Sequence, residues 1–452
     1  MLATIKTSLF RLSLLFACIL FLECSKTDHN SNKTQDEATL SFVKTLGGSK
    51  NESAQAIVNT SDGGYAILGY AQSMDGELSN KKDDSFDFWL LKFDQNDILQ
   101  WQKHYGGTDE DRGQDIIQTA DGGYAIIGFT KSNSNDVLEN NGAQDYWVSK
   151  LDASGNISWK KNFGFSGVDI GYSIIETQDN GFLLSGVLDV SASNGAGNSK
   201  NSNTKGVLHA GGDYWAIKLN AFGEKQWSRY FGGTFTDTPY DAIQTEDNGY
   251  LLVGSTDSAD VDIKNSKGSY DFWIVKISET GTLVWETSYG GSQIDEARGI
   301  TKSKDGNYII VGDTRSNDKD VTFNNGAADL WVIKISPAGE LIWEKTFGGS
   351  NFDVARSITA TQNDTFIISG SSRSADGHLT NNNGQNDAWV LKIDSNGQLK
   401  WQKSIGGSNI DFAQDAAVLH NNSIIVVGHS SSSNLDVLEN KGFSDVLIVK
   451  IE

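Results

Sequence analysis

Short runs of apolar and aromatic residues recur along the chain from residue 40 to its end. In one copy they cover residues 115–119, 123–130, 145–151 and 156–163, and they are rich in Ile, Val, Tyr, Phe and Trp. These residue types favour β-strands, and Asp- and Gly-containing turn sequences separate the runs. No helical period of useful length follows the first 23 residues. The pattern predicts four short antiparallel strands in each copy.

Seven copies of this unit follow one another. All 12 tryptophans fall into two series, spaced by 58 residues with one interval of 68. The first series is Trp89, Trp147, Trp215, Trp273, Trp331 and Trp389, and the second is Trp101, Trp159, Trp227, Trp285, Trp343 and Trp401. A glycine series has the same spacing: Gly69, Gly128, Gly186, Gly254, Gly312, Gly370 and Gly428. Such repetition predicts an all-β, seven-bladed β-propeller with four antiparallel strands per blade.

The ends of the repeat region predict how the ring closes. The last copy stops at residues 445–452, which form a third strand, and it lacks a fourth. Residues 40–46 form an unpaired fourth strand before the first complete copy, with Phe42 in the tryptophan position. We expect this N-terminal strand to join the last blade, which removes the open sheet edges. The propeller domain is therefore assigned to residues 39–452.

The segment Asp152-x-x-Gly155-x-x-x-Trp159 resembles the tryptophan-docking repeat of quinoprotein-like propellers, with one residue fewer between Asp and Gly. The resemblance implies that the tryptophan packs between neighbouring blades. Residues 40–452 also resemble the repeat propellers of bacterial surface lipoproteins, many of which have no known ligand.

The N-terminus has the features of an export signal. Residues 1–23 contain a basic start and an apolar stretch too short to span a bilayer. Cys24 follows, and with the polar residues after it this segment resembles the lipoproteins of Bacteroidota-type bacteria, although Glu23 stands where a small residue is usual. We assign residues 24–38 to a lipid anchor and disordered tether, at the outer membrane or cell surface. Cys18 as the anchor, or ordinary signal cleavage without lipid, are the alternatives.

Net charge and cysteine content limit the classes of ligand and partner that the protein can bind. The formal net charge is −21, which repels phosphate backbones and argues against nucleic acid. No cysteine follows Cys24, so the propeller has no disulfide and no cysteine-ligated metal. We expect a monomer that binds a protein or a glycan.

Two sets of acids recur in the repeats. The first follows each Gly-Gly turn, and we expect it to be structural, as we do the tryptophans; it includes Asp111, Asp295, Asp353 and Asp411. The second lies in the loops between the second and third strands: Asp136, Asp260, Asp262, Asp318, Asp320, Asp376 and Asp436. Oxygen-rich loops can hold Ca²⁺, so a ligand or calcium site is predicted there, but the spacing is not that of an EF-hand and turn capping explains the same residues.

Catalytic motifs are not found in the sequence. The six histidines do not recur with the repeat, and no radial set of Arg, Lys and acid for a quinone can be picked out. We therefore favour a non-catalytic binding or scaffold protein. The alternatives are a propeller enzyme acting on glycans, a quinoprotein-like dehydrogenase, or a structural subunit of an envelope complex. Binding is expected on the face that carries the long second-to-third-strand loops, where the third copy also has an insertion within residues 191–212.

Overall fold

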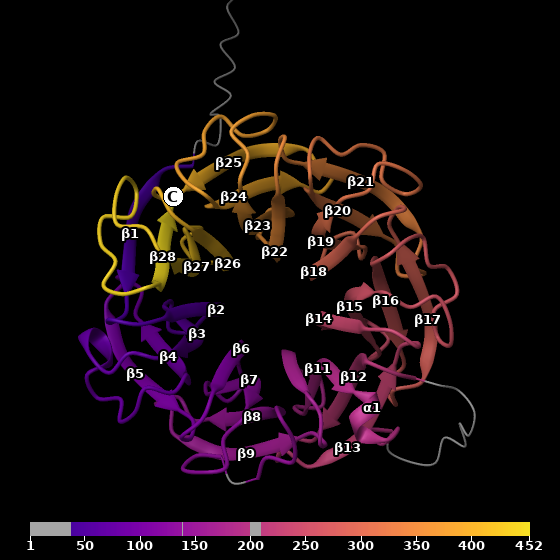
Figure 1. Ribbon diagram of the computed structural model, residues 1–452, viewed down its shortest axis with the longest axis horizontal. Coiled ribbons are helices and arrows are strands. Elements are labelled where there is room, and N and C mark those ends of the chain that lie inside the picture. The colour runs from indigo at the N-terminus through magenta and orange to yellow at the C-terminus, as the bar shows by residue number, and fades with distance from the viewer. Residues whose placement is uncertain (1–37, 138, 199–208) are drawn as a thin grey trace, which may run out of the picture. The chain divides into compact units, whose positions relative to one another are not determined.

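The computed structural model describes residues 38–137, 139–198 and 209–452, and these form a closed ring of seven four-stranded antiparallel sheets (Figure 1). The first strands, nearest the centre of the ring, are β2 (Glu52–Asn59), β6 (Asp111–Gln118), β10 (Ile170–Glu176), β14 (Asp237–Gln244), β18 (Asp295–Lys302), β22 (Asp353–Ala360) and β26 (Asp411–Val418). The second strands are β3 (Tyr65–Ala71), β7 (Tyr124–Thr130), β11 (Phe182–Asp189), β15 (Tyr250–Thr256), β19 (Tyr308–Thr314), β23 (Thr365–Ser372) and β27 (Ile424–Ser430).

The outer half of each blade contains its third and fourth strands. The third strands are β4 (Asp87–Phe93), β8 (Asp145–Leu151), β12 (Gly212–Leu219), β16 (Asp271–Ile277), β20 (Asp329–Ile335), β24 (Asp387–Asp394) and β28 (Asp445–Ile451). The fourth strands are β5 (Leu99–Tyr105), β9 (Ile157–Phe163), β13 (Lys225–Phe231), β17 (Leu283–Tyr289), β21 (Leu341–Phe347), β25 (Leu399–Ile405) and β1 (Leu40–Leu46). The helical turns are η1 (Gly76–Leu78) and α1 (Val190–Ser193). The predicted fold class is confirmed.

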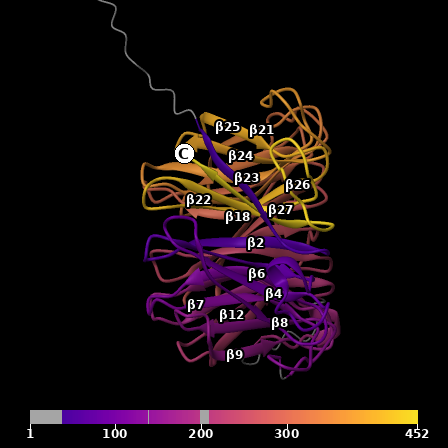
Figure 2. The same ribbon diagram turned by 90° about the vertical axis from the view of Figure 1, so that its left-hand side faces the viewer.

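Strand β1 closes the ring, as the sequence predicted. It pairs antiparallel with β28, from Leu40 opposite Ile451 to Leu46 opposite Val446. The amide of Thr39 donates to the carbonyl of Glu452 at 2.7 Å, which extends the pairing by one residue. In Figures 1 and 2 the indigo β1 lies along the outer side of the yellow last blade. The last blade is therefore built from both ends of the repeat region.

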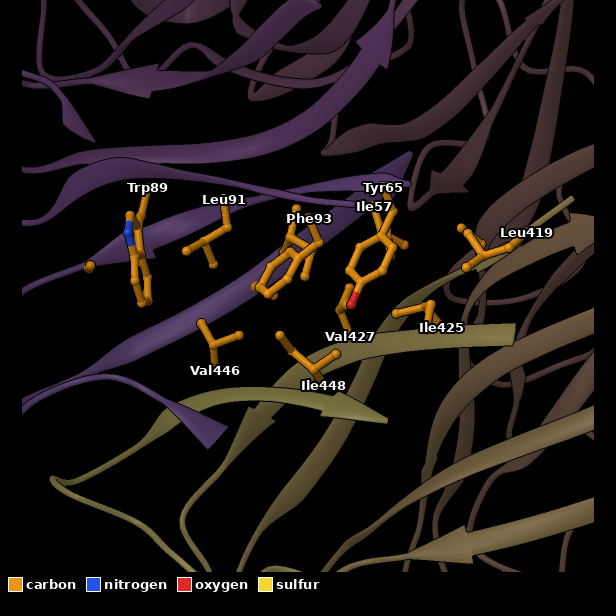
Figure 3. Close-up of a cluster of buried hydrophobic side chains, with 14 of the residues drawn as sticks. Ile57, Tyr65, Trp89, Leu91, Phe93, Leu419, Ile425, Val427, Val446 and Ile448 are labelled. Atoms are coloured by element: carbon orange, nitrogen blue, oxygen red, sulfur yellow. The ribbon is translucent and has the colours of Figure 1, made fainter. Parts of the chain in front are cut away.

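The hydrophobic core lies between blades rather than inside one. In the cluster of Figure 3, Trp89 and Phe93 of β4 face Val446 and Ile448 of β28, and Tyr65 of β3 packs beside them. Most third strands are buried along their whole length, because a blade covers each of their two faces. This explains why those strands have continuous apolar runs rather than alternation.

Each first strand contains a β-bulge. In β6 the register with β7 shifts between Gly113 and Asp115, so Gln114 is the extra residue, and the other six first strands shift at the equivalent place. The bulge brings the carbonyl of Arg112 to 2.0 Å from where a Cβ on Gly128 would lie, so this position accepts only glycine. The recurring glycine series therefore follows from the bulge.

The predicted start of one first strand was wrong, because the sequence analysis did not allow for the bulge. The first strand of the second blade was expected over residues 115–119, but β6 begins four residues earlier, at Asp111. The extra residue interrupts the alternation of apolar and polar positions, and this conceals the polar first half of the strand.

Recurring lysines join the third strand to the turn between the first and second strands, at one face of the ring. Lys276 of β16 is 5% exposed, and its Nζ lies 2.8 Å from Asp247 in the short turn between the first and second strands. Equivalent pairs are Lys92–Asp62, Lys150–Asp121, Lys218–Asp179 and Lys334–Asp305. The acids of these short turns are therefore used within the blades. We call this side of the ring the turn face.

Candidate functional site

The opposite side, which we call the loop face, carries the loops between second and third strands and the Gly-Gly turns between blades. The acid after each Gly-Gly turn stabilises it from inside. Asp295 is fully buried, and its Oδ2 accepts hydrogen bonds from the Gly291 amide at 2.7 Å and the Ser316 hydroxyl at 2.8 Å. The Thr314 hydroxyl donates to its Oδ1. Burial raises the pKa of Asp295, and these three donors oppose the rise.

The same arrangement recurs around the ring. Asp111, Asp353 and Asp411 each accept a hydrogen bond from the second glycine of their turn, at 2.6, 2.7 and 2.8 Å respectively, and two more from hydroxyl groups. Because all their partners are groups of the turn and the adjoining loop, these carboxylates act as turn caps within the blade.

The long loops are fixed to the same turns. Asp260 accepts hydrogen bonds from both the amide and the hydroxyl of Thr234, at 3.0 and 2.8 Å. Asp318 accepts from the amide of Ser292 at 2.7 Å, and Asp376 from that of Ser350 at 2.8 Å. A second hydrogen bond is made two residues later in the loop. Its acceptors are Asp262, Asp320 and Asp436, and its donors are the amides of Gly232, Gly290 and Gly406, each at 3.2 Å. Asp136 departs from this pattern and lies 3.8 Å from Lys160.

These hydrogen bonds direct the carboxylate oxygens of the loop acids toward backbone donors. Within residues 38–137, 139–198 and 209–452 no three His, Cys, Asp or Glu side chains are grouped so that they could hold a metal ion. A calcium site in the loops stays a prediction. What the contacts do establish is that each long loop is held against the turn that enters its own blade.

The tryptophans fill two layers of the packing. Those of the first series are at most 1% exposed, inside the third strands. Those of the second series are half-buried on the outermost strands, where Trp101 packs against Gly155 in the turn of the next blade. A Cβ at Gly155 would lie 3.0 Å from the Trp101 ring, so the glycine gives the ring its space. Gly223, Gly281, Gly339 and Gly397 meet Trp159, Trp227, Trp285 and Trp343 in the same way. Trp401 is likewise half-buried, on β25.

Exposed apolar side chains gather on the loop face. Eight of the thirteen exposed large hydrophobic residues of the described chain lie in its loops and Gly-Gly turns: Met74, Val168, Phe235, Phe323, Phe352, Leu435, Leu438 and Phe443. Phe235 is 60% exposed, Phe443 72% and Leu438 84%. The loops that present them are the ones held by carboxylate–amide bonds. The loop face therefore offers apolar groups on a rigid support, which is the usual setting of a binding surface.

The insertion of the third copy is only partly described. Its first residues form α1, whose preceding residue Asp189 accepts a hydrogen bond from the Ala192 amide at 2.9 Å. His209, after the undescribed residues 199–208, bonds the buried carboxylate of Asp213 through Nδ1 at 2.6 Å. The described ends of the insertion are thus joined to the blade.

Sequence reasoning missed one set of residues. The bulged residue of each first strand points to the axis of the ring, and in the fifth and sixth blades it is Arg298 and Arg356. The signal was present as the third residue after each recurring acid, but that residue changes from blade to blade and so does not appear as a series.

Cys18, Cys24 and the predicted signal and tether lie outside the described residues. Among the described helical segments, none is long and apolar enough to cross a bilayer.

No known protein-family model matches the chain. It is 22% identical over 412 residues to the regulatory protein FlaEY of Caulobacter vibrioides, which covers 81% of this chain and 41% of that protein. The chain thus spans less than half the length of this curated relative.

Solved structures that the chain resembles include the WD40 domain of Pan2 from Neurospora crassa, at 9% identity and a TM-score of 0.49 over 92% of this chain and 96% of that one. Sqt1 from Chaetomium thermophilum is similar at 11% identity and a TM-score of 0.48, over 91% and 99% of the two chains. Both TM-scores are below 0.5, so the fold described above rests on the strand topology and not on these structures.

Proposed function

We propose that this protein is a non-catalytic binding protein of the cell envelope, which engages a protein partner through its loop face. The observation that carries the proposal is the placement of eight exposed apolar side chains on loops that are tied to the framework. Preorganised loops lose little entropy on binding, and phenylalanine and methionine are enriched in the cores of protein interfaces. The relative named a regulatory protein is consistent with a role in binding.

The turn face is the less suitable side. Its Asp side chains are paired with the buried lysines of the third strands, and its connections are short. It carries fewer exposed apolar residues, among them Ile98 and Phe222. A partner would find less adaptable loop surface there.

Partner capture with matched variants tests the choice of face. One variant combines Phe235→Ser, Phe323→Ser and Phe443→Ser on the loop face, and the control combines Ile98→Ser, Phe222→Ser and Leu341→Ser elsewhere on the ring. We expect a protein from the envelope fraction to be captured by the wild type and the control, and to be lost with the loop-face variant.

Loss with the control variant alone would place the interface elsewhere and overturn the proposal. A glycan array run with the same three proteins covers the alternative ligand: loop-face-dependent binding to a glycan, without a captured protein, would replace the protein partner with a glycan.

The envelope location rests on the N-terminal sequence. An apolar stretch ends at Leu22, two residues before Cys24, and a polar segment follows, so the proposal has Cys24 acylated and the ring held at the outer membrane or cell surface. Two or more acyl chains would anchor it stably. We expect Cys24→Ser to move the protein to the soluble fraction, whereas Cys18→Ser leaves it in the membrane. An unmodified mature N-terminus downstream of residue 24, found by mass spectrometry, would rule out the anchor.

A further inference from the structure

The seven bulged residues of the first strands meet at the axis of the ring. They are Gln55, Gln114, Tyr172, Tyr240, Arg298, Arg356 and Gln414, and they line one cavity of about 160 Å³. The backbone bulge is the same in every blade, so the framework does not require different side chains at this position. At this position the seven blades carry three glutamines, two tyrosines and two arginines.

Two arginines stand side by side in this cavity, on the neighbouring strands β18 and β22. Arg298 lies over the ring of Tyr240, at 4.0 Å from its centroid, and contacts Glu296 at 3.2 Å. Arg356 makes no hydrogen bond or ion pair with any described residue. Burial and the charge of Arg298 lower its pKa, and the charges of the carboxylates of Asp313 and Glu296 oppose that shift.

The Nε–H groups of both arginines are shielded from solvent and have no acceptor within the described chain. Two largely buried cations side by side are costly, and within the described chain only Arg298 of the two forms an ion pair, with Glu296. The pair therefore favours an anion between the two guanidinium groups.

Three carboxyl groups line the same cavity. Asp115, Asp241 and Asp415 each accept a hydrogen bond from an amide of the next blade's first strand, those of Ile174, Ile300 and Ile57 respectively, all at 2.9 Å. Each also accepts one from the amide that follows it in its own strand. These carboxyl groups are fixed, and those that are ionised oppose the entry of a highly charged anion.

We infer that the axial cavity binds a small organic carboxylate, whose oxygens the guanidinium groups of Arg298 and Arg356 bind. A planar carboxylate matches the paired donors of a guanidinium, and its single charge suits a cavity that also contains three acidic side chains better than the double charge of a phosphate dianion does. Tyr172 and Tyr240, whose ring centroids are 5.2 Å apart, form an aromatic wall for the rest of the molecule, and the glutamines supply amides. The volume suits a ligand of a few heavy atoms and excludes a large cofactor.

A second cavity lies beside this site, toward the loop face. The Gln55 amide donates to the Ser53 hydroxyl at 2.8 Å, and Ser53 lines a neighbouring cavity of about 290 Å³ with Arg112 and His429. Asn51 and Phe86, which lie at the loop face, line the same cavity. The two cavities are therefore neighbours, joined at their linings by the Gln55–Ser53 hydrogen bond.

Ligand-observed NMR with the purified chain tests this site. The probes are sodium acetate and its neutral isostere acetamide, followed by displacement with propionate or inorganic phosphate. We expect saturation transfer to acetate but not to acetamide, and displacement by propionate at lower concentration than by phosphate. Arg356→Gln should weaken acetate binding about 10-fold or more, because it removes a charge-assisted pair.

Arg373→Gln is the matched control, since Arg373 contacts Asn386 through Nε outside the axial cavity. It should bind acetate like the wild type, and Arg356→Lys, which keeps the charge without the fork, should bind with intermediate affinity. Far-ultraviolet circular dichroism confirms that each variant is folded. Equal binding of acetate and acetamide, unchanged binding in folded Arg356→Gln, or stronger displacement by phosphate would each overturn the inference, and none of these results bears on the loop-face partner.

Discussion

Buried carboxylates occur in two settings along the first strand of a blade. At its start, acids such as Asp295 accept three hydrogen bonds from one turn and its adjoining loop. Four residues later, Asp115 and Asp241 reach to the next blade instead, and they face the axis. The first setting stabilises a turn within a blade, and the second joins two blades while placing a titratable group in the cavity.

Asp115 should make stability depend on pH. Burial raises its pKa to about 8, well above the value of about 3.9 in an unfolded chain. Between these two pKa values the folded state holds a proton that the unfolded state has lost. The contribution of Asp115 to stability is therefore fully present below about pH 4 and is lost as the pH rises through 8. We expect the free energy of unfolding of the wild type to fall between pH 6.5 and 8.5, by at most ~1.4 kcal/mol per pH unit from this group.

Asp115→Asn should flatten that dependence, because the amide keeps an acceptor for the Ile174 amide and does not titrate. Asp241→Asn is the comparison, since burial raises the pKa of Asp241 only to about 6 and most of its effect falls below pH 6.5. Denaturant unfolding at a series of pH values measures the slopes. Equal slopes for the wild type and Asp115→Asn over this range would contradict the assignment.

The strands whose bounds were predicted accurately from the sequence are those that are buried along their whole length. The third strand of the second blade was predicted at the residues that β8 occupies, since both its faces are covered and the apolar run is unbroken. The start of β6 was missed because its bulge breaks the alternation. The axial residues were missed for a related reason: Arg298 and Arg356 occupy the bulge itself, where neither period nor composition repeats.

The loop acids were found from sequence, but their partners were not. Asp318 and Asp320 could equally well have held a cation or capped a turn, because the residue types suit both. Which role these acids take depends on where the amides of Gly290 and Ser292 lie. The position of these amides is determined by the Gly-Gly turn between neighbouring blades. Sequence spacing does not contain that information.

Strand β1 gives the element-scale prediction. It supplies the whole fourth strand of the last blade, and its Phe42 and Leu46 pack against the core between the first and last blades. Deleting residues 38–48 should lower the melting temperature of the ring markedly, because it exposes that core and unpairs β28. Deleting residues 25–36, which lie outside the described structure, should leave the melting temperature unchanged. Equal melting temperatures for the two truncations would contradict closure by β1.

In the whole molecule, the residues that repeat from blade to blade and the residues that vary lie in different places. The caps, the bulges, the lysine–aspartate pairs and the packed tryptophans recur in most blades and build the ring. The exposed apolar residues of the loop face and the charged residues of the axis do not repeat. Binding specificity is therefore expected where side chains vary on a common backbone, and the two places can be tested separately.

Hydrogen–deuterium exchange of the protein with and without its captured partner tests the central claim most directly. The account predicts slower exchange on binding in loop-face segments 230–240, 316–328 and 432–444, with no change in the turn-face segments 94–98, 152–156 and 220–224. Backbone amides in a rigid interface are shielded when the partner covers them. Protection confined to the turn-face segments, with the loop-face segments unchanged, would contradict the account.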